Sequence, residues 1–143
     1  KDDALWVNLY IPSTLNWSEQ GMTLQLDTTM PQSGSATLTV HCSQPTAAKI
    51  RLRIPGWIAS APTITVNGST QNVTANASSY VELSRTWSDG DVIGLTLPMG
   101  MRLDRSMDDS TQVSLFLGPI LLAADLGTSG MPASDQAAGQ LDY

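Results

Sequence analysis

The sequence predicts an all-β protein, an antiparallel two-sheet β-sandwich of the jelly-roll-like kind with about nine short strands. Three observations carry this prediction. Apolar and polar side chains alternate with a period of two along most of the chain, and no long window sustains the 3.6-residue period of a helix. Turn residues separate the alternating segments, and the Thr, Val and Ile content suits a pleated surface. A single open sheet would leave one apolar face in water, so two sheets are expected to pack together.

The first expected strand covers residues 5–11 and has two different sides. Its apolar side consists of Leu5, Val7, Leu9 and Ile11. Its aromatic side consists of Trp6, Asn8 and Tyr10. Because indole and phenol rings are large and amphipathic, the aromatic side is not expected to face bare water. It is predicted either to bind a saccharide or to pack against another domain that this chain does not include.

Eight further strands are expected from the same alternation. They cover residues 22–28, 36–42, 49–54, 63–66, 80–84, 91–97, 112–117 and 120–126. In the third of these segments, Lys49, Arg51 and Arg53 form a basic stripe on the outer face, opposite an apolar inner face. We expect this stripe to pair with acidic side chains on neighbouring strands, and contact with a substrate or a partner domain is the alternative.

Five residues at the strand ends are predicted to have structural roles. Asn67 and Gly68 supply the two positive-φ positions of a type I′ hairpin turn. Asp91 follows Asp89-Gly90 at a turn, where a carboxylate bonds the local backbone. Trp57 and Trp87 are expected to close the ends of the sandwich.

The sandwich is expected to form one domain over residues 1–126. From residue 127 to residue 143, Gly, Ser, Ala, Asp and Gln dominate without periodicity, which predicts a linker or a disordered tail. A length of 143 residues suits one domain, or a piece of a larger protein.

Charge and composition argue against several classes of function. The formal net charge is −6, which opposes binding to nucleic acid or to an anionic membrane surface. No apolar run reaches the roughly 20 residues that span a bilayer, and the first residues lack the apolar stretch of a signal peptide. One cysteine excludes an internal disulfide and a multi-cysteine zinc site.

The supply of catalytic groups is small. His41 is the only histidine and lies on the solvent side of its strand, while Cys42 lies on the inner side without an evident base. Glu19 and Glu82 are the only glutamates for a glycosidase pair. The aspartates cluster near turns, and although a structural calcium site is an alternative, their spacing matches no defined calcium loop. We therefore assign no catalytic residue and no metal ligand.

Five ordered motifs resemble glycoside hydrolase family 127, whose characterised members are β-L-arabinofuranosidases. Residues 5–13, LWVNLYIPS, are similar to the family segment LYVNLYIPS. Residues 51–57 resemble LRIPxW, residues 66–68 its VNG and residues 118–121 its GPL strand. Residues 80–99 fit its Y-x-x-x-x-R-x-W-x-x-GD…LPM segment. The resemblance runs from about residue 5 to residue 126.

The resemblance implies a long enzyme in which an (α/α)6 barrel holds the active site and β-sandwich material follows it. It implies a cysteine nucleophile and a zinc ion held by cysteines and a glutamate, all before the segment that begins this chain. Cys42 matches none of those cysteines, so zinc is expected only in the catalytic domain, which this chain lacks. The chain resembles the C-terminal β-sandwich portion and is expected to be inactive by itself.

Two functions are therefore weighed, with a third behind them. The first is an accessory domain that packs on the catalytic barrel of the same protein through Trp6, Asn8 and Tyr10. The second is an independent carbohydrate-binding module that uses the same side chains as a platform for a glycan. The third is an adhesion or interaction domain unrelated to sugars. The compartment stays open between periplasmic or secreted and cytoplasmic.

Overall fold

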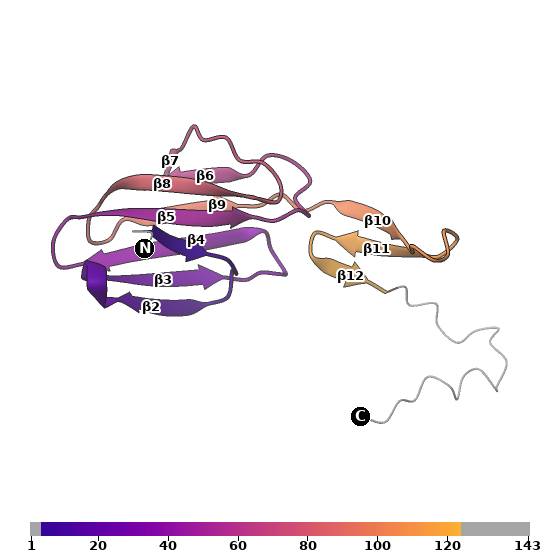
Figure 1. Cartoon of the computed structure of the whole chain (residues 1–143), viewed down its shortest axis with the longest axis horizontal. Helices are drawn as coiled ribbons and strands as arrows, with labels where there is room; N and C mark the ends of the chain where they lie inside the picture. The colour runs from indigo at the N-terminus through magenta and orange to yellow at the C-terminus, as the bar shows by residue number, and fades with distance from the viewer. Residues whose placement is uncertain (1–3, 124–143) are drawn as a thin grey trace, which may run out of the picture.

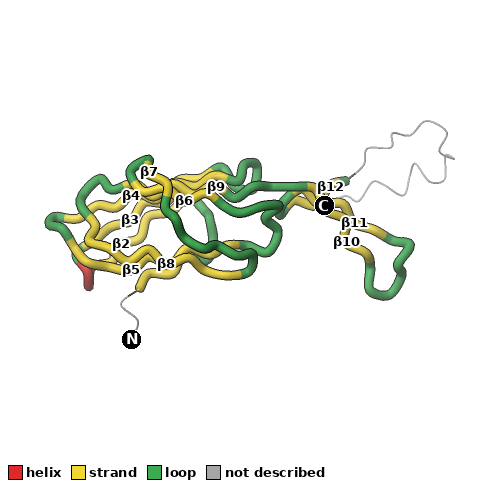
Figure 2. Tube along the Cα trace, turned by 90° about the horizontal axis from the view of Figure 1, so that it is seen from above, coloured by secondary structure: helices red, strands yellow, loops and turns green. Residues whose placement is uncertain are grey.

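The computed structural model describes residues 4–123, which form three β-sheets (Figure 1). A three-stranded sheet has the strand order β1-β5-β8, and a six-stranded sheet has the order β2-β3-β4-β9-β6-β7. These two sheets pack face to face as a sandwich, and the third sheet, β10-β11-β12, lies beyond one end of it (Figure 2). The all-β fold and the two-sheet sandwich are thus confirmed.

The strands are short throughout. The three-stranded sheet contains β1 (Ala4–Val7), β5 (Thr46–Ile54) and β8 (Ser79–Trp87). The six-stranded sheet contains β2 (Ser13–Trp17), β3 (Met22–Thr28), β4 (Ser35–Cys42), β6 (Thr63–Val66), β7 (Ser69–Thr70) and β9 (Val92–Thr96). The third sheet contains β10 (Met101–Arg105), β11 (Val113–Leu117) and β12 (Ile120–Leu122). A single 3-10 turn, η1 (Ser18–Gln20), joins β2 to β3. No helix within residues 4–123 is long and apolar enough to cross a bilayer.

The hydrophobic core lies between the two facing sheets and follows the predicted alternation. Every second residue of β3, β4, β5, β6 and β9 is buried, and these residues share one cluster. The largest fully buried side chains include Trp87, Met22, Leu24, Ile50, Leu52 and Ile54. Burying them removes apolar area from water at about 25 cal/mol per Å² and drives the two sheets together.

The first strand is shorter than predicted, and the burial predicted for its second half is wrong. β1 ends at Val7, and the following residues cross from the three-stranded sheet to the six-stranded sheet, where β2 begins. Leu9 and Ile11, expected inside, are 64% and 58% exposed. Tyr10, expected outside, packs against the core, and its hydroxyl donates a hydrogen bond to the carbonyl of Arg53 at 2.6 Å. The reversal arises because the chain leaves its strand before the alternation ends.

The pairing of β1 also differs from a purely antiparallel sandwich. β1 runs parallel to β5, with Trp6 opposite Arg51 and Val7 opposite Leu52, whereas the other strand pairs are antiparallel. Parallel neighbours need a long crossover, and here the three strands β2, β3 and β4 of the opposite sheet supply it.

Three strands were not predicted. β2 is an exposed edge strand, β7 has two residues, and β10 alternates only over Met101–Arg105. The last predicted strand is limited to Ile120–Leu122 within the described residues, and residues 124–126 lie outside them. The predicted tail, residues 127–143, also lies outside the described residues.

The third sheet is separate from the sandwich. Its three strands pair only with one another, so the two facing sheets use strands between Ala4 and Thr96. This differs from the sandwich expected over residues 1–126.

The turn between β6 and β7 is tied to the start of β9 by a network of polar side chains. Asn67 and Gly68 have φ values of 52° and 78°, as a type I′ turn requires. Asn67 Nδ2 donates to the Asp91 carboxylate at 2.8 Å, and Asn67 Oδ1 accepts from the backbone N–H of Val92 at 2.8 Å. Asp91 also accepts from the backbone N–H of Ser88 at 2.9 Å. These donors, the Ser88 N–H first, lower the pKa of Asp91 below its ordinary value.

Candidate docking surface

The two outer faces of the sandwich have different chemistry. The outer face of the six-stranded sheet is rich in threonine, with Thr37 and Thr39 on β4 and Thr63 and Thr65 on β6, and it suits contact with water. The outer face of the three-stranded sheet carries aromatic and charged side chains. We call this second surface the β1-β5-β8 face and define it by Trp6, Asn8, Lys49, Arg51, Tyr80 and Glu82.

Strand register brings the members of the β1-β5-β8 face together. Trp6 lies opposite Arg51, and Arg51 lies opposite Glu82, so these three side chains form one row across the sheet. Tyr80 lies opposite Arg53 in the next part of β5. Because directly opposite residues project to the same side, residues distant in sequence share one surface here.

The aromatic rings of this face are exposed but held in place. Trp6 and Tyr80 are 41% and 42% exposed, and their ring centroids lie 4.8 Å apart in an edge-to-face arrangement. The Arg51 guanidinium lies over the Trp6 ring, 4.4 Å from its centroid. The Tyr80 hydroxyl donates a hydrogen bond to Asn8 Oδ1 at 2.7 Å. Such cation–π and ring contacts order a side chain that would otherwise sample several rotamers.

The charges on this face are mostly positive. Arg51 Nε and Lys49 Nζ lie 2.7 and 3.7 Å from the two Glu82 carboxylate oxygens, which confirms the cross-strand pairing predicted for the basic stripe. The hydrogen bond from Arg51 lowers the pKa of Glu82. With Arg53 beside them, three cations share one carboxylate, although the chain as a whole is acidic. Exposed pairs of this kind add little stability, so their main effect is on recognition.

The geometry of Trp6 bears on the two functions weighed from the sequence. A sugar stacks on a flat and open indole face. The Arg51 guanidinium covers one face of the Trp6 ring, and Tyr80 approaches at an interplanar angle of 81°. This arrangement suits a packed interface between proteins better than an open platform for a glycan.

Of the three residues predicted on the aromatic side, the structure brings two together. Trp6 and Asn8 share the β1-β5-β8 face, whereas Tyr10 points into the sandwich. Burial raises the pKa of the Tyr10 hydroxyl, which therefore stays protonated and donates to Arg53. Tyr80 completes the face instead. The alternation of β8 places Tyr80 outward, but no pattern in the sequence placed it beside Trp6.

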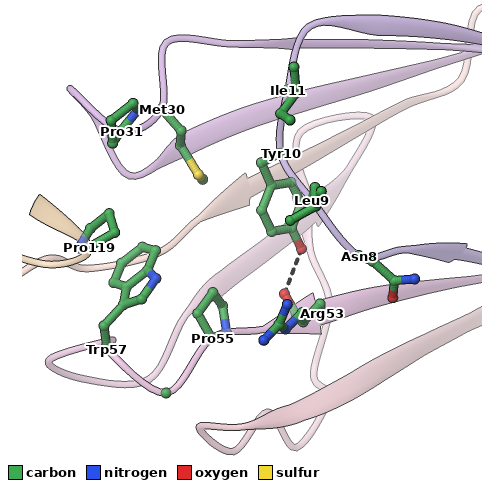
Figure 3. Close-up of a pocket in the computed structure, with 11 residues that line it drawn as sticks. Asn8, Leu9, Tyr10, Ile11, Met30, Pro31, Arg53, Pro55, Trp57 and Pro119 are labelled. Atoms are coloured by element: carbon green, nitrogen blue, oxygen red, sulfur yellow. Dashed lines mark hydrogen bonds between the residues drawn. The ribbon is translucent and has the colours of Figure 1, made fainter.

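A pocket of about 350 Å³ opens where the sandwich meets the third sheet (Figure 3). Its walls are mainly apolar and include Tyr10, Met30, Pro31, Pro55, Trp57 and Pro119. Trp57 lies next to Pro119 and away from the Tyr10–Arg53 hydrogen bond. Trp87, the other tryptophan predicted at a sandwich end, is fully buried, and its Nε1 donates to the carbonyl of Ala48 at 3.0 Å.

Groups that could perform chemistry are dispersed over residues 4–123. His41 lies 3.4 Å from Asp89, and both side chains are exposed. Burial, followed by the charges of Asp89 and Asp91, raises the pKa of Cys42, which opposes thiolate formation. No three His, Cys, Asp or Glu residues in this part of the chain are grouped so that they could hold a metal ion. The turn carboxylates of Asp108 and Asp109 instead accept local hydrogen bonds.

Comparison with known proteins gives a consistent result. Residues 4–99 match the family described as "Beta-L-arabinofuranosidase, GH127 middle domain". A solved structure described as a glycoside hydrolase is 30% identical, with a TM-score of 0.71 over 81% of this chain. The GH127 β-L-arabinofuranosidase Ara127N-Se from Geobacillus stearothermophilus T6 is 26% identical, with a TM-score of 0.72 over 85% of this chain. The GH127 β-arabinofuranosidase BT3674 is 26% identical, with a TM-score of 0.71 over 84%.

Those solved chains are much longer than this one. The present chain covers 20%, 20% and 22% of their lengths, in the same order. No protein with a curated description matches.

Proposed function

Because this chain belongs to the family of GH127 β-L-arabinofuranosidase middle domains, we propose that it is a non-catalytic accessory domain of a longer glycoside hydrolase. In this proposal it packs on the catalytic (α/α)6 barrel that the resemblance implies and supports it. The family description places the sandwich in the middle of such proteins, whereas the sequence placed it in the C-terminal portion. The observation that carries the proposal is the exposed and ordered β1-β5-β8 face.

The chemistry of this face favours a protein partner. Trp, Tyr and Arg dominate the energetics of many protein interfaces, because they combine large contact area with directed polar groups. Trp6, Arg51 and Tyr80 provide this combination, and the surrounding side chains already fix their orientation. A partner surface that carries carboxylates would complement the excess of positive charge.

The zinc ion implied by the resemblance does not fit the described residues of this chain. They contain no group of three donors that could coordinate it, and the single thiol, Cys42, has a raised pKa. We propose that any zinc is bound by the catalytic domain, and no step of the reaction is derived through it here.

We expect the docking face to reveal itself when Trp6 and Tyr80 are both replaced by alanine in the longer enzyme. Loss of two central aromatic side chains from a packed interface should lower the melting temperature by at least about 5 °C and shorten the lifetime of the activity on heating. The matched control is Thr37→Ala with Thr65→Ala on the opposite outer face, which should leave both unchanged. Equal melting temperatures for the aromatic double variant and the parent enzyme would overturn the proposal.

The alternative function, an independent carbohydrate-binding module, makes a different prediction. Calorimetric titration of the isolated 143-residue chain with arabinofuranosides and plant cell-wall oligosaccharides is expected to give no saturable heat, because Arg51 occupies one face of the Trp6 ring. Saturable binding that disappears in Trp6→Ala, but persists in a His41→Ala control, would favour the carbohydrate-binding module.

A further inference from the structure

The third sheet has an almost entirely apolar face. Cross-strand register sets Met101 opposite Leu117 and Leu103 opposite Leu115. It also sets Leu115 opposite Leu122 and Leu117 opposite Ile120. Opposite residues project to the same side, so one side carries six large apolar residues, which we call the third-sheet apolar face. They are Met101, Leu103, Leu115, Leu117, Ile120 and Leu122.

The other side of this sheet is adapted to water. The Arg102 guanidinium lies 4.2 Å from the centroid of the Phe116 ring and donates a hydrogen bond to the carbonyl of Gly118 at 2.7 Å. Arg102 also pairs with Asp104 at 3.2 Å, and Ser114 is exposed beside them. One apolar side and one polar side are typical of an antiparallel sheet that packs on a core with one face only.

Within residues 4–123 this core is missing its second half. Met101 is 67% exposed and Leu103 is 64% exposed, although both lie in the middle of paired strands. Three short strands without a covering layer are marginally stable in water. An apolar surface of this kind marks a contact with another layer of structure.

We propose that the third-sheet apolar face is one half of a second hydrophobic core, which a further β-layer of the same longer polypeptide closes. This inference goes beyond the proposed function, uses a different surface and does not depend on docking through Trp6. It shares with the proposed function only the premise that the chain belongs to a longer protein.

The occupant is argued from the matching structures. They cover 81–85% of this chain, which is more than residues 4–99 account for, so most of the third sheet recurs in them. About four fifths of each of those chains lies outside the match, which leaves ample polypeptide for a covering layer. The remaining residues of this chain are a poor candidate. Residues 124–143 contain Leu126, Met131, Leu141 and Tyr143 as their only large apolar or aromatic side chains, without alternation.

Two lysine substitutions on opposite sides of the same strand pair test the proposal. Leu103→Lys places a charge on the apolar face, whereas Ser114→Lys places one on the polar face, opposite Asp104. In the longer polypeptide, Leu103→Lys should lower the melting temperature by at least about 5 °C and Ser114→Lys by less than about 1 °C. In the 143-residue chain, both variants should stay within about 2 °C of the parent, because both sites are exposed there.

Methionine oxidation provides a readout that requires no destabilised variant. Peroxide should oxidise Met101 at least about tenfold more slowly in the longer polypeptide than in the 143-residue chain, as measured by peptide mass spectrometry. Equal Met101 rates in the two proteins would overturn the proposal. So would a dimer of the 143-residue chain that Leu103→Lys dissociates, because the face would then be covered by a second copy. A normal effect of Trp6→Ala with an unprotected Met101 would leave the proposed function intact and reject this inference alone.

Discussion

Replacing Trp87 by alanine is expected to remove about 3–5 kcal/mol from the free energy of unfolding of the isolated chain. Trp87 has no exposed surface, so the change opens a large cavity in the core. It also leaves the carbonyl of Ala48, which accepts the indole hydrogen bond at 3.0 Å, without that donor. Urea denaturation followed by circular dichroism measures the loss, since three other tryptophans complicate the fluorescence signal.

Two companion variants make the Trp87 result interpretable. Trp87→Phe keeps much of the apolar volume and loses the hydrogen bond, so it should show a smaller loss than Trp87→Ala and remain measurable if the alanine variant does not fold. Trp6→Ala makes the same chemical change at a half-exposed site and should cost less than about 1 kcal/mol in the isolated chain. Similar losses at the two tryptophans would contradict the assignment of Trp87 to the core.

The second large effect is expected at Asp91. Asp91→Ala should destabilise the isolated chain by about 2–3 kcal/mol, because it removes the acceptor of two charge-assisted hydrogen bonds and loosens the turn held by Asn67. The matched control is Asp27→Ala, an exposed aspartate on β3 in the same sheet as that turn, which should change little. Equal effects of the two alanine substitutions would show that the network contributes nothing specific.

The contribution of Asp91 should also depend on pH in a defined direction. Its pKa is lower in the folded chain than the ordinary value near 4, so its stabilising effect is fully present above about pH 4. The effect is lost as the pH falls through the lowered pKa, because the unfolded chain then binds the proton first. The stability difference between the parent chain and Asp91→Asn should therefore shrink between pH 7 and pH 3. A difference that stays constant over this range would exclude the predicted linkage.

Local alternation predicted the core well because burial on one face of a sheet leaves a direct trace in the sequence. Leu24, Leu38, Ile50 and Ile93 all lie inside as their spacing indicates. The same rule failed at Leu9, because the alternation continues past the point where the chain leaves β1. Where a strand ends depends on which partner is available, and that information is not local.

The candidate surface was predicted in part for the same reason. Trp6 and Asn8 lie next to one another in sequence, and their shared side was visible from the spacing. Tyr80 and Glu82 reach the same surface only through the register of β8 on β5. The third sheet was missed as a separate unit, because the alternation of its strands does not reveal which layer, if any, covers them.

The crossing between β1 and β2 has a consequence for the whole domain. Residues 8–12 join the two facing sheets, and Tyr10 fixes this connection by packing on the core and bonding the backbone of Arg53 in β5. Rotation of one sheet against the other would require Tyr10 to give up both contacts. A body seated on Trp6 is therefore expected to keep a constant angle to the far sheet, so that the domain acts as a stiff spacer and not as a hinge.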